Sequence, residues 1–258
     1  MDHLDIATAD GEQLHAVHLP GPAGTRAVAV VLAHGFTGHS GKPAVQRIAR
    51  RLATTAGVLA YDARGHGRST GLSTLGDREV LDVDAVVATA RSLGYDAVVT
   101  CGWSMGGSTV VRHAALRGRA VAGHLLRHAP DAVVSVSATS RWFVRDTRPM
   151  RLVHLAVETR AGRWVTRHRF GVRVSPRGWD PLPASPLECV AAVAPLPLLL
   201  VHGDADAYFT LEHPRALLAA AGEPVELWLE PGFGHAEEAA GAELLDRLAR
   251  RVGELVAC

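Results

Sequence analysis

Cysteine is scarce in this 258-residue sequence, which contains only Cys101, Cys189 and Cys258. Their spacing matches no pattern of metal ligands, and three cysteines do not make a disulfide framework. Neither a zinc site nor a disulfide-stapled fold is therefore expected. Cys101 lies in an apolar run, where we expect a buried structural thiol.

An excess of charge of one sign and a long hydrophobic run are also missing. The formal net charge of +1 gives no overall reason to expect nucleic-acid binding, and no stretch approaches the length of a membrane span. The N-terminus, Met1 to Asp5, lacks the basic start and apolar run of a secretory signal. We therefore expect a cytoplasmic protein.

What the sequence does contain is an alternation of short apolar runs and amphipathic stretches. Asp10-Gly11 separates two segments of alternating character, Leu4 to Thr8 and Gln13 to Leu19, and predicts an antiparallel hairpin. Further strands are expected at residues 27–33, 57–61, 97–101, 132–136, 198–202 and 225–229, and helices at 43–55, 77–93, 214–221 and 236–256. This pattern predicts the α/β class, with a mostly parallel eight-stranded sheet and helices on both faces.

The alternation is lost between residues 138 and 195, which we call the cap segment. We expect it to be a small inserted cap, with residues 1–137 and 196–258 forming the core. A helix near Pro149 to Ala161 is expected to turn apolar side chains toward the site. The stretch from Arg141 to Asp180 contains ten arginines and three carboxylates, which gives it a formal net charge of +7. These arginines either pair with carboxylates and water or attract an anionic substrate or carrier.

The stretch around Ser104 carries the clearest chemical signal. An apolar run, Ala97 to Cys101, is followed by Gly102-Trp103-Ser104-Met105-Gly106-Gly107 and then by a helix-favouring segment. A serine at a sharp strand-to-helix turn, with glycines two residues before and after it, is typical of a nucleophile elbow. The alternative is a glycine-rich turn whose serine only caps the helix.

A serine hydroxyl needs a base to take its proton, and the base needs a partner that fixes its tautomer. Asp204 and Asp206 follow the strand at 198–202, and either aspartate can orient a base. His235 lies in a glycine-bounded loop after the last predicted strand. The order along the chain is serine, aspartate, histidine.

These motifs together resemble the α/β-hydrolase superfamily, and the chain is most similar to its small esterases, monoacylglycerol lipases and serine aminopeptidases. The resemblance covers nearly the whole length and rests on His34-Gly35-Phe36, Asp62-x-Arg64-Gly65-His66-Gly67-x-Ser69, the Ser104 motif, His202-Gly203-x-x-Asp206 and Gly234-His235.

By this resemblance Asp206 is the acid, with Asp204 as the fallback, and the backbone amides of Phe36 and Met105 form the oxyanion hole. His66 belongs to a structural loop; a role as base is the weaker alternative. Serine at the elbow disfavours dehalogenases and epoxide hydrolases, whose elbow residue is aspartate.

The resemblance implies a serine hydrolase of the carboxylesterase type (EC 3.1) that cleaves an ester of a small or medium acyl or aromatic acid through an acyl-enzyme. Trp142, Phe143 and Trp164 of the cap segment are the expected substrate contacts. No metal or organic cofactor is expected, because the chain supplies the nucleophile, base and oxyanion donors. The alternatives are a thioesterase acting on a coenzyme A or carrier-protein thioester, and a binding protein without turnover.

Overall fold

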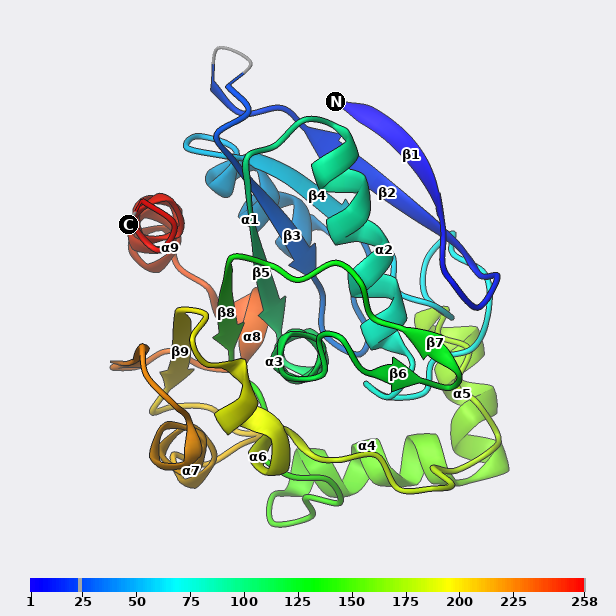
Figure 1. Ribbon diagram of the computed structural model, residues 1–258. Coiled ribbons are helices and arrows are strands. Elements are labelled where there is room, and N and C mark those ends of the chain that lie inside the picture. Colours follow the sequence, from blue (N-terminus) through cyan, green and yellow to red (C-terminus); the bar gives the residue numbers. More distant parts are fainter. Residues whose placement is uncertain (23–24, 258) are drawn as a thin grey trace.

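A computed structural model describes residues 1–22 and 25–257 (Figure 1). One eight-stranded sheet runs through the molecule in the order β1-β2-β4-β3-β5-β8-β9-β10. The strands are β1 (Asp2–Ala7), β2 (Gln13–Leu19), β3 (Val28–Ala33), β4 (Gly57–Tyr61), β5 (Ala97–Trp103), β8 (Ala132–Val136), β9 (Leu198–Gly203) and β10 (Val225–Glu230). β2 pairs antiparallel with both β1 and β4, and the pairs from β4 to β10 are parallel. The predicted α/β class and mostly parallel sheet are confirmed.

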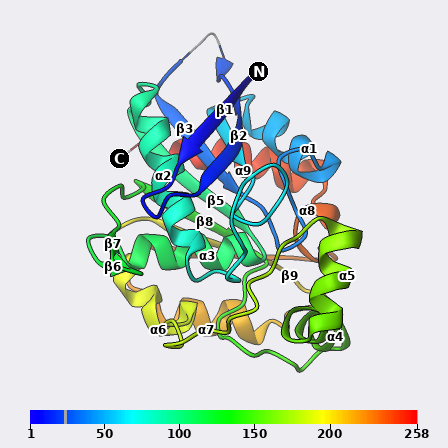
Figure 2. The same cartoon turned by 90° about the vertical axis from the view of Figure 1, so that its right-hand side faces the viewer.

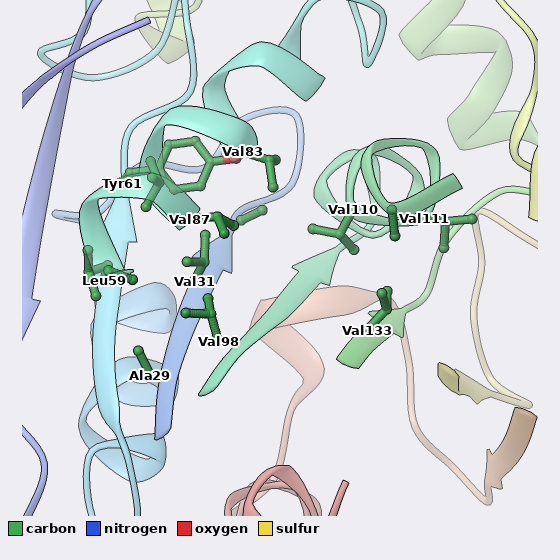
Figure 3. Packing of buried hydrophobic residues seen from close by; sticks show 14 of the residues in the cluster. Ala29, Val31, Leu59, Tyr61, Val83, Val87, Val98, Val110, Val111 and Val133 are labelled. Atoms are coloured by element: carbon green, nitrogen blue, oxygen red, sulfur yellow. The ribbon is translucent and has the colours of Figure 1, made fainter. Parts of the chain in front are cut away.

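The central strands are apolar along their whole length because both faces of the sheet are covered. β4, β5, β8 and β9 are buried at nearly every position. One face packs on α2 (Glu79–Ser92) and α3 (Met105–Ala115), whose valines meet Val31, Val98 and Val133 of the sheet (Figure 3). The other face packs on α1 (Pro43–Leu52) and α9 (Ala242–Glu254). Within the described ranges, no helix combines the length and apolar character needed to cross a bilayer.

The prediction of a single C-terminal helix over residues 236–256 is wrong in one respect, because the structure has two helices there. α8 (Ala236–Ala239) is a single turn, and α9 starts at Ala242. Ala240 and Gly241 between them are extended, with ψ of 112° and 166°. This break lets α8 lie beside the end of α1 while α9 runs back along the sheet.

Between β8 and β9 the chain forms α4 (Arg148–Glu158), α5 (Arg160–Phe170), α6 (Pro186–Cys189) and a 3-10 turn over Val190–Val193. After β9 comes α7 (Glu212–Ala220). α4 and α5 lie together at one end of the molecule, beyond the sheet (Figures 1 and 2). Two short strands, β6 (Ala120–Val121) and β7 (His124–Leu125), form a separate hairpin after α3.

The helix predicted at Pro149 to Ala161 ends early, and the second helix, α5, was not predicted. Thr159 is extended, its hydroxyl donates to the carbonyl of Leu155, and it accepts from the N–H of Gly162. A Cβ on Gly162 would lie 2.3 Å from the Leu155 carbonyl oxygen, so the two helices meet where only glycine fits. The chain therefore turns sharply between α4 and α5.

Candidate active site

Ser104 occupies the turn between β5 and α3 in a strained backbone conformation, with φ of 51° and ψ of −115°. A Cβ on Gly102 would lie 2.2 Å from the carbonyl oxygen of Gly106, and one on Gly106 would lie 2.4 Å from that of Ala33. The two glycines therefore permit the close approach of strand and helix that the turn requires. The predicted strand, turn and helix are all present.

Ser104, His235 and Asp206 form a chain of hydrogen bonds. Nε2 of His235 lies 2.9 Å from the hydroxyl of Ser104, and Nδ1 lies 2.8 Å from Oδ2 of Asp206. A carboxylate at Nδ1 keeps the proton on that nitrogen, which leaves Nε2 free to accept the proton of the serine. The arrangement can therefore activate Ser104 as a nucleophile.

The loops after β9 and β10 bring the aspartate and the histidine together, because these strands are parallel neighbours. A Cβ on Gly203 would lie 1.8 Å from the carbonyl oxygen of Phe233, so the two loops touch where the glycine sits. Asp204 points elsewhere, and its carboxylate accepts the N–H of Gly232 at 2.6 Å. The structure thus places Asp206, and not Asp204, on His235.

The Asp206 side chain is buried and well provided with donors. Its Oδ1 accepts the N–H groups of Tyr208 at 2.7 Å and Phe209 at 3.1 Å. Burial acts to raise the pKa of the carboxyl, but the hydrogen bonds from His235 and from these two amides outweigh it and lower the pKa below its ordinary value. Asp206 is therefore held as the carboxylate.

Two aromatic rings that the sequence did not single out enclose His235. The ring of Tyr208 stacks on it, with centroids 4.3 Å apart, and Phe209 meets it edge-on at 5.5 Å. Both residues also line the cavity in front of Ser104. Their only sequence signal is their position directly after the acid.

The two predicted oxyanion donors and Ser104 border the same cavity. Phe36 follows β3, Met105 is the first residue of α3, and both line the same cavity as Ser104. In the described part of the chain, no acceptor bonds to the N–H of either residue. Both amides are therefore free to bind an oxygen of a substrate.

The cavity in front of Ser104 has a volume of about 370 Å³ and is mostly apolar. Trp142 and Phe143, two of the expected substrate contacts, line it. Trp179, which was not proposed as a contact, lines it too and packs on both rings, with centroids 4.9 and 5.6 Å away. Trp164 does not belong to the lining: it lies on α5, is 63% exposed and stacks on His168. The turn at Thr159 points this part of α5 away from the cavity.

The loop from Asp62 to Ser69 is fixed by buried polar contacts. The guanidinium of Arg64 donates to Asp82 and Asp10, and Asp62 accepts the N–H groups of Ser40 and Arg68. His66 is fully buried, and its ring nitrogens face the carbonyls of Arg64 and Phe36. Its ring makes no contact with Ser104 that would suit a base, which agrees with a structural role.

Two of the arginines at the start of the cap segment are paired. Arg141 donates to Glu212 at 2.6 Å and to Asp146 at 3.3 Å, and Arg145 donates to Glu158 at 2.6 Å. Arg148 has no carboxylate within ion-pair distance among the described residues. Part of the positive charge is therefore neutralised within the protein.

Several known proteins are similar to this chain. The uncharacterized protein YfhR of Escherichia coli O157:H7 is 26% identical over 243 residues, which cover 91% of this chain and 73% of YfhR. The esterase Pf2001 of Pyrococcus furiosus superposes with a TM-score of 0.71 at 21% identity, covering 99% of this chain and 91% of the esterase. Est1E of Butyrivibrio proteoclasticus, solved with ferulic acid bound, superposes with a TM-score of 0.65 at 21% identity, covering 96% of each chain.

The solved structures share the fold, and the sequence itself identifies the family. The family model for serine aminopeptidase, S33, matches residues 24–169, which is more than half of the chain. This region contains the His34 loop, the Arg64 loop and the Ser104 turn. The chain belongs to the serine aminopeptidase S33 family of α/β hydrolases.

Proposed function

We propose that this protein is a serine carboxylesterase that cleaves an ester of a small or medium acyl or aromatic acid. The observation that carries the proposal is the hydrogen-bonded chain from Asp206 through His235 to Ser104, at the floor of an apolar cavity. Free backbone N–H groups at Phe36 and Met105 support it, because a tetrahedral intermediate needs such donors for its oxyanion.

In the first half of the reaction Ser104 Oγ attacks the ester carbonyl carbon while Nε2 of His235 takes the serine proton. The N–H groups of Phe36 and Met105 bind the oxyanion. As the carbon–oxygen bond to the alcohol breaks, His235 gives its proton to the leaving oxygen, and an acyl-enzyme remains.

In the second half His235 takes a proton from water, which attacks the acyl carbon. The second tetrahedral intermediate collapses, the carboxylic acid leaves, and the proton returns to Ser104. Asp206 holds the ring in the required tautomer and stabilises the imidazolium in both halves.

The lining of the cavity suggests the substrate class. Trp142, Phe143 and Trp179 offer aromatic surface to an acyl or aryl group, and the cavity suits a small ligand. The esterase Pf2001 and the ferulic acid complex of Est1E share this fold and agree with an ester of this kind. We further propose that residues 1–137 and 196–258 carry the chemistry and that the cap segment selects the substrate.

A thioester of coenzyme A or of an acidic carrier is the second candidate, favoured by the net charge of +7 between Arg141 and Asp180. If these arginines attract the substrate, added salt should lower kcat/KM for an acyl-coenzyme A and leave a neutral ester nearly unchanged. Replacing Arg141, Arg145 and Arg148 together should reproduce the loss for the thioester alone. Equal salt responses would reject this candidate.

The experiment that tests the proposal combines covalent labelling with a substrate series. A fluorophosphonate probe should label the wild-type protein and not Ser104→Ala, and p-nitrophenyl esters from acetate upward should be hydrolysed by the wild type alone. A binding protein without turnover would hydrolyse none of them, and hydrolysis retained in Ser104→Ala would reject the mechanism.

A further inference from the structure

Glu237 is a carboxylate at the site that the Ser104, His235 and Asp206 chain does not use. It is the second residue of α8, lies two positions after His235 and lines the cavity. Its Oε1 accepts the backbone N–H of Gly35 at 2.6 Å, across 202 residues of sequence. Gly35 directly precedes Phe36, the proposed oxyanion donor, so Glu237 contacts the segment that forms the oxyanion hole.

The carboxylate also lies close to the nucleophile. A Cβ built on Gly35 would be 3.2 Å from Oε2 of Glu237 and 3.3 Å from Cβ of Ser104. The side chain of Glu237 and that of Ser104 therefore border the same small space above Gly35. A side chain at position 35 would crowd this space, and Glu237 or Ser104 would have to shift by a few tenths of an ångström to admit it.

The carbonyl between Gly35 and Phe36 is held from the other side. It accepts Nδ1–H of His34 at 2.7 Å and the N–H of Gly38 at 2.8 Å. Because Nε2 of His34 accepts the N–H of Ala63, the ring proton must be on Nδ1. The direction of this bond is thus fixed.

These contacts determine where the N–H of Phe36 points. In a trans peptide the C=O and the following N–H point in opposite directions, so fixing the carbonyl of Gly35 also fixes the N–H of Phe36. The carbonyl of Phe36 faces Nε2 of His66 at 2.5 Å. Of the four polar backbone atoms of Gly35 and Phe36, only the N–H of Phe36 is left without a partner in the described structure.

We infer that Glu237 is a positioning residue: by binding the N–H of Gly35 it holds the peptide that precedes the Gly35–Phe36 peptide and so, together with the two donors on the Gly35 carbonyl, keeps the N–H of Phe36 toward the oxyanion. The inference rests on the proposed function. Glu237 touches neither substrate carbonyl nor nucleophile in this role, and acts through Gly35.

Burying the carboxylate of Glu237 costs free energy, which argues against an incidental contact with Gly35. Burial raises the pKa of its carboxyl, and the N–H of Gly35 and the nearby His235 offset this only in part, while Glu238 adds to it. Arg47 of α1 donates to the backbone carbonyl of Glu237 and so anchors the residue rather than its carboxylate. In the described part of the chain, Gly35 is the one other residue that donates a hydrogen bond to the side chain.

The test compares Glu237→Ala with Glu237→Gln, since glutamine keeps an acceptor oxygen of the same reach and removes the charge. Glu237→Ala should lower kcat for a p-nitrophenyl ester about 10- to 100-fold with KM within about threefold, because the donor is displaced rather than removed. Glu237→Gln should restore kcat to within about threefold of the wild type. Glu243→Ala, an exposed glutamate in the first turn of α9 that does not belong to the cavity lining, is the control and should behave like the wild type.

A second readout separates positioning from a general loss of structure. A trifluoromethyl ketone adds to Ser104 and places an oxyanion in the hole, so its affinity should fall in Glu237→Ala by the same factor as kcat/KM. The thermal midpoint and the far-UV circular dichroism spectrum show whether the variant is folded. Unchanged kcat in a folded Glu237→Ala, or a Glu237→Gln as slow as Glu237→Ala, would overturn the inference. Failure of the proposed function looks different: the wild type would then hydrolyse esters independently of Ser104, or not at all.

Discussion

The groups around Ser104 and the side chains of the cap segment are held in contrasting ways. At the site, Asp206, His34 and His66 are buried and bound by hydrogen bonds at fixed distances. In the cap segment, Phe143 is 56% exposed and Leu152 of α4 is 58% exposed. The core, residues 1–137 and 196–258, holds these groups in one geometry. The cap segment adds exposed apolar surface beside Trp142 and Trp179, whose indole N–H groups are hydrogen-bonded.

We propose that this difference separates catalysis from substrate selection. Donors that are fixed in advance stabilise a transition state without reorganisation, whereas loosely packed apolar side chains can adapt to more than one acyl group. We therefore expect substitutions in the core to affect turnover or folding strongly, and substitutions in the cap segment to change substrate choice modestly. The predictions below test this division in order of expected effect.

The largest effects are expected at the hydrogen-bonded chain. Ser104→Ala and His235→Ala should each lower kcat about 10⁵- to 10⁶-fold, and Asp206→Asn about 10⁴-fold, without unfolding the protein. The losses should not add in double variants, because the three residues act as a unit. Asp204→Asn is the control. If it were as inactive as Asp206→Asn, the assignment of the acid would be wrong.

Next in size is the close contact between the loops after β9 and β10. Gly203→Ala places a methyl group 1.8 Å from the carbonyl oxygen of Phe233, so the backbone has to shift. The free energy of unfolding should fall by about 3 kcal/mol or more in urea denaturation, with loss of activity. Gly253→Ala, in α9 with no atom within 4 Å of the new methyl group, should instead be neutral or stabilising. Equal stability of the two variants would contradict the tight packing of these two loops.

The buried His34 should make stability depend on pH. Burial and the nearby His66 lower the pKa of His34 from its ordinary value of 6.5 to about 3. Between these values the unfolded chain binds a proton that the folded protein does not, so the free energy of unfolding falls as the pH drops below 6.5. From pH 7 to pH 5 this contributes about 2 kcal/mol.

The measurement is urea denaturation of the wild type and His34→Asn at both pH values. The variant should be less stable at pH 7 and should show a smaller loss on acidification. Other buried histidines, such as His213, contribute equally to both proteins, so the difference reports His34. If the stability of the two proteins depended on pH in the same way, this would contradict a neutral His34 ring with both nitrogens hydrogen-bonded.

The smallest effects are expected in the cap segment. Phe143→Ala removes part of the cavity lining and should raise KM for an aromatic ester about threefold to tenfold, with kcat and stability nearly unchanged. Trp164→Ala, on the exposed side of α5, should change neither parameter for the same ester. A rise in KM in Trp164→Ala equal to that in Phe143→Ala would show that the cavity extends over α5.

The sequence predicted the sheet and the Ser104, Asp206 and His235 arrangement because each depends on local patterns. Strands covered on both faces are continuous apolar runs, and loops at the carboxyl ends of neighbouring parallel strands come together wherever the fold forms. The choice between Asp204 and Asp206 needed the family resemblance, since both follow β9 and differ only in what their carboxylates meet.

The remaining features depend on contacts that leave no recognisable pattern in the local sequence. The break at Thr159 depends on its hydroxyl and on the close approach at Gly162, and it decides that Trp164 points outward. Thr and Gly are both tolerated in helices, so their local sequence did not reveal the turn. The contact between Glu237 and Gly35 joins residues that are 202 positions apart, and such a contact leaves no periodic pattern in the sequence.

The order of the sheet has a consequence for biosynthesis. Ser104 leaves the ribosome 131 residues before His235, and the two strands that bring Asp206 and His235 to it, β9 and β10, are the last to be made. A nascent or truncated chain that ends before β10 has the nucleophile but no base. On the mechanism proposed above, the chain cannot attack esters until β10 and the loop that carries His235 have been synthesised and β10 has paired with β9.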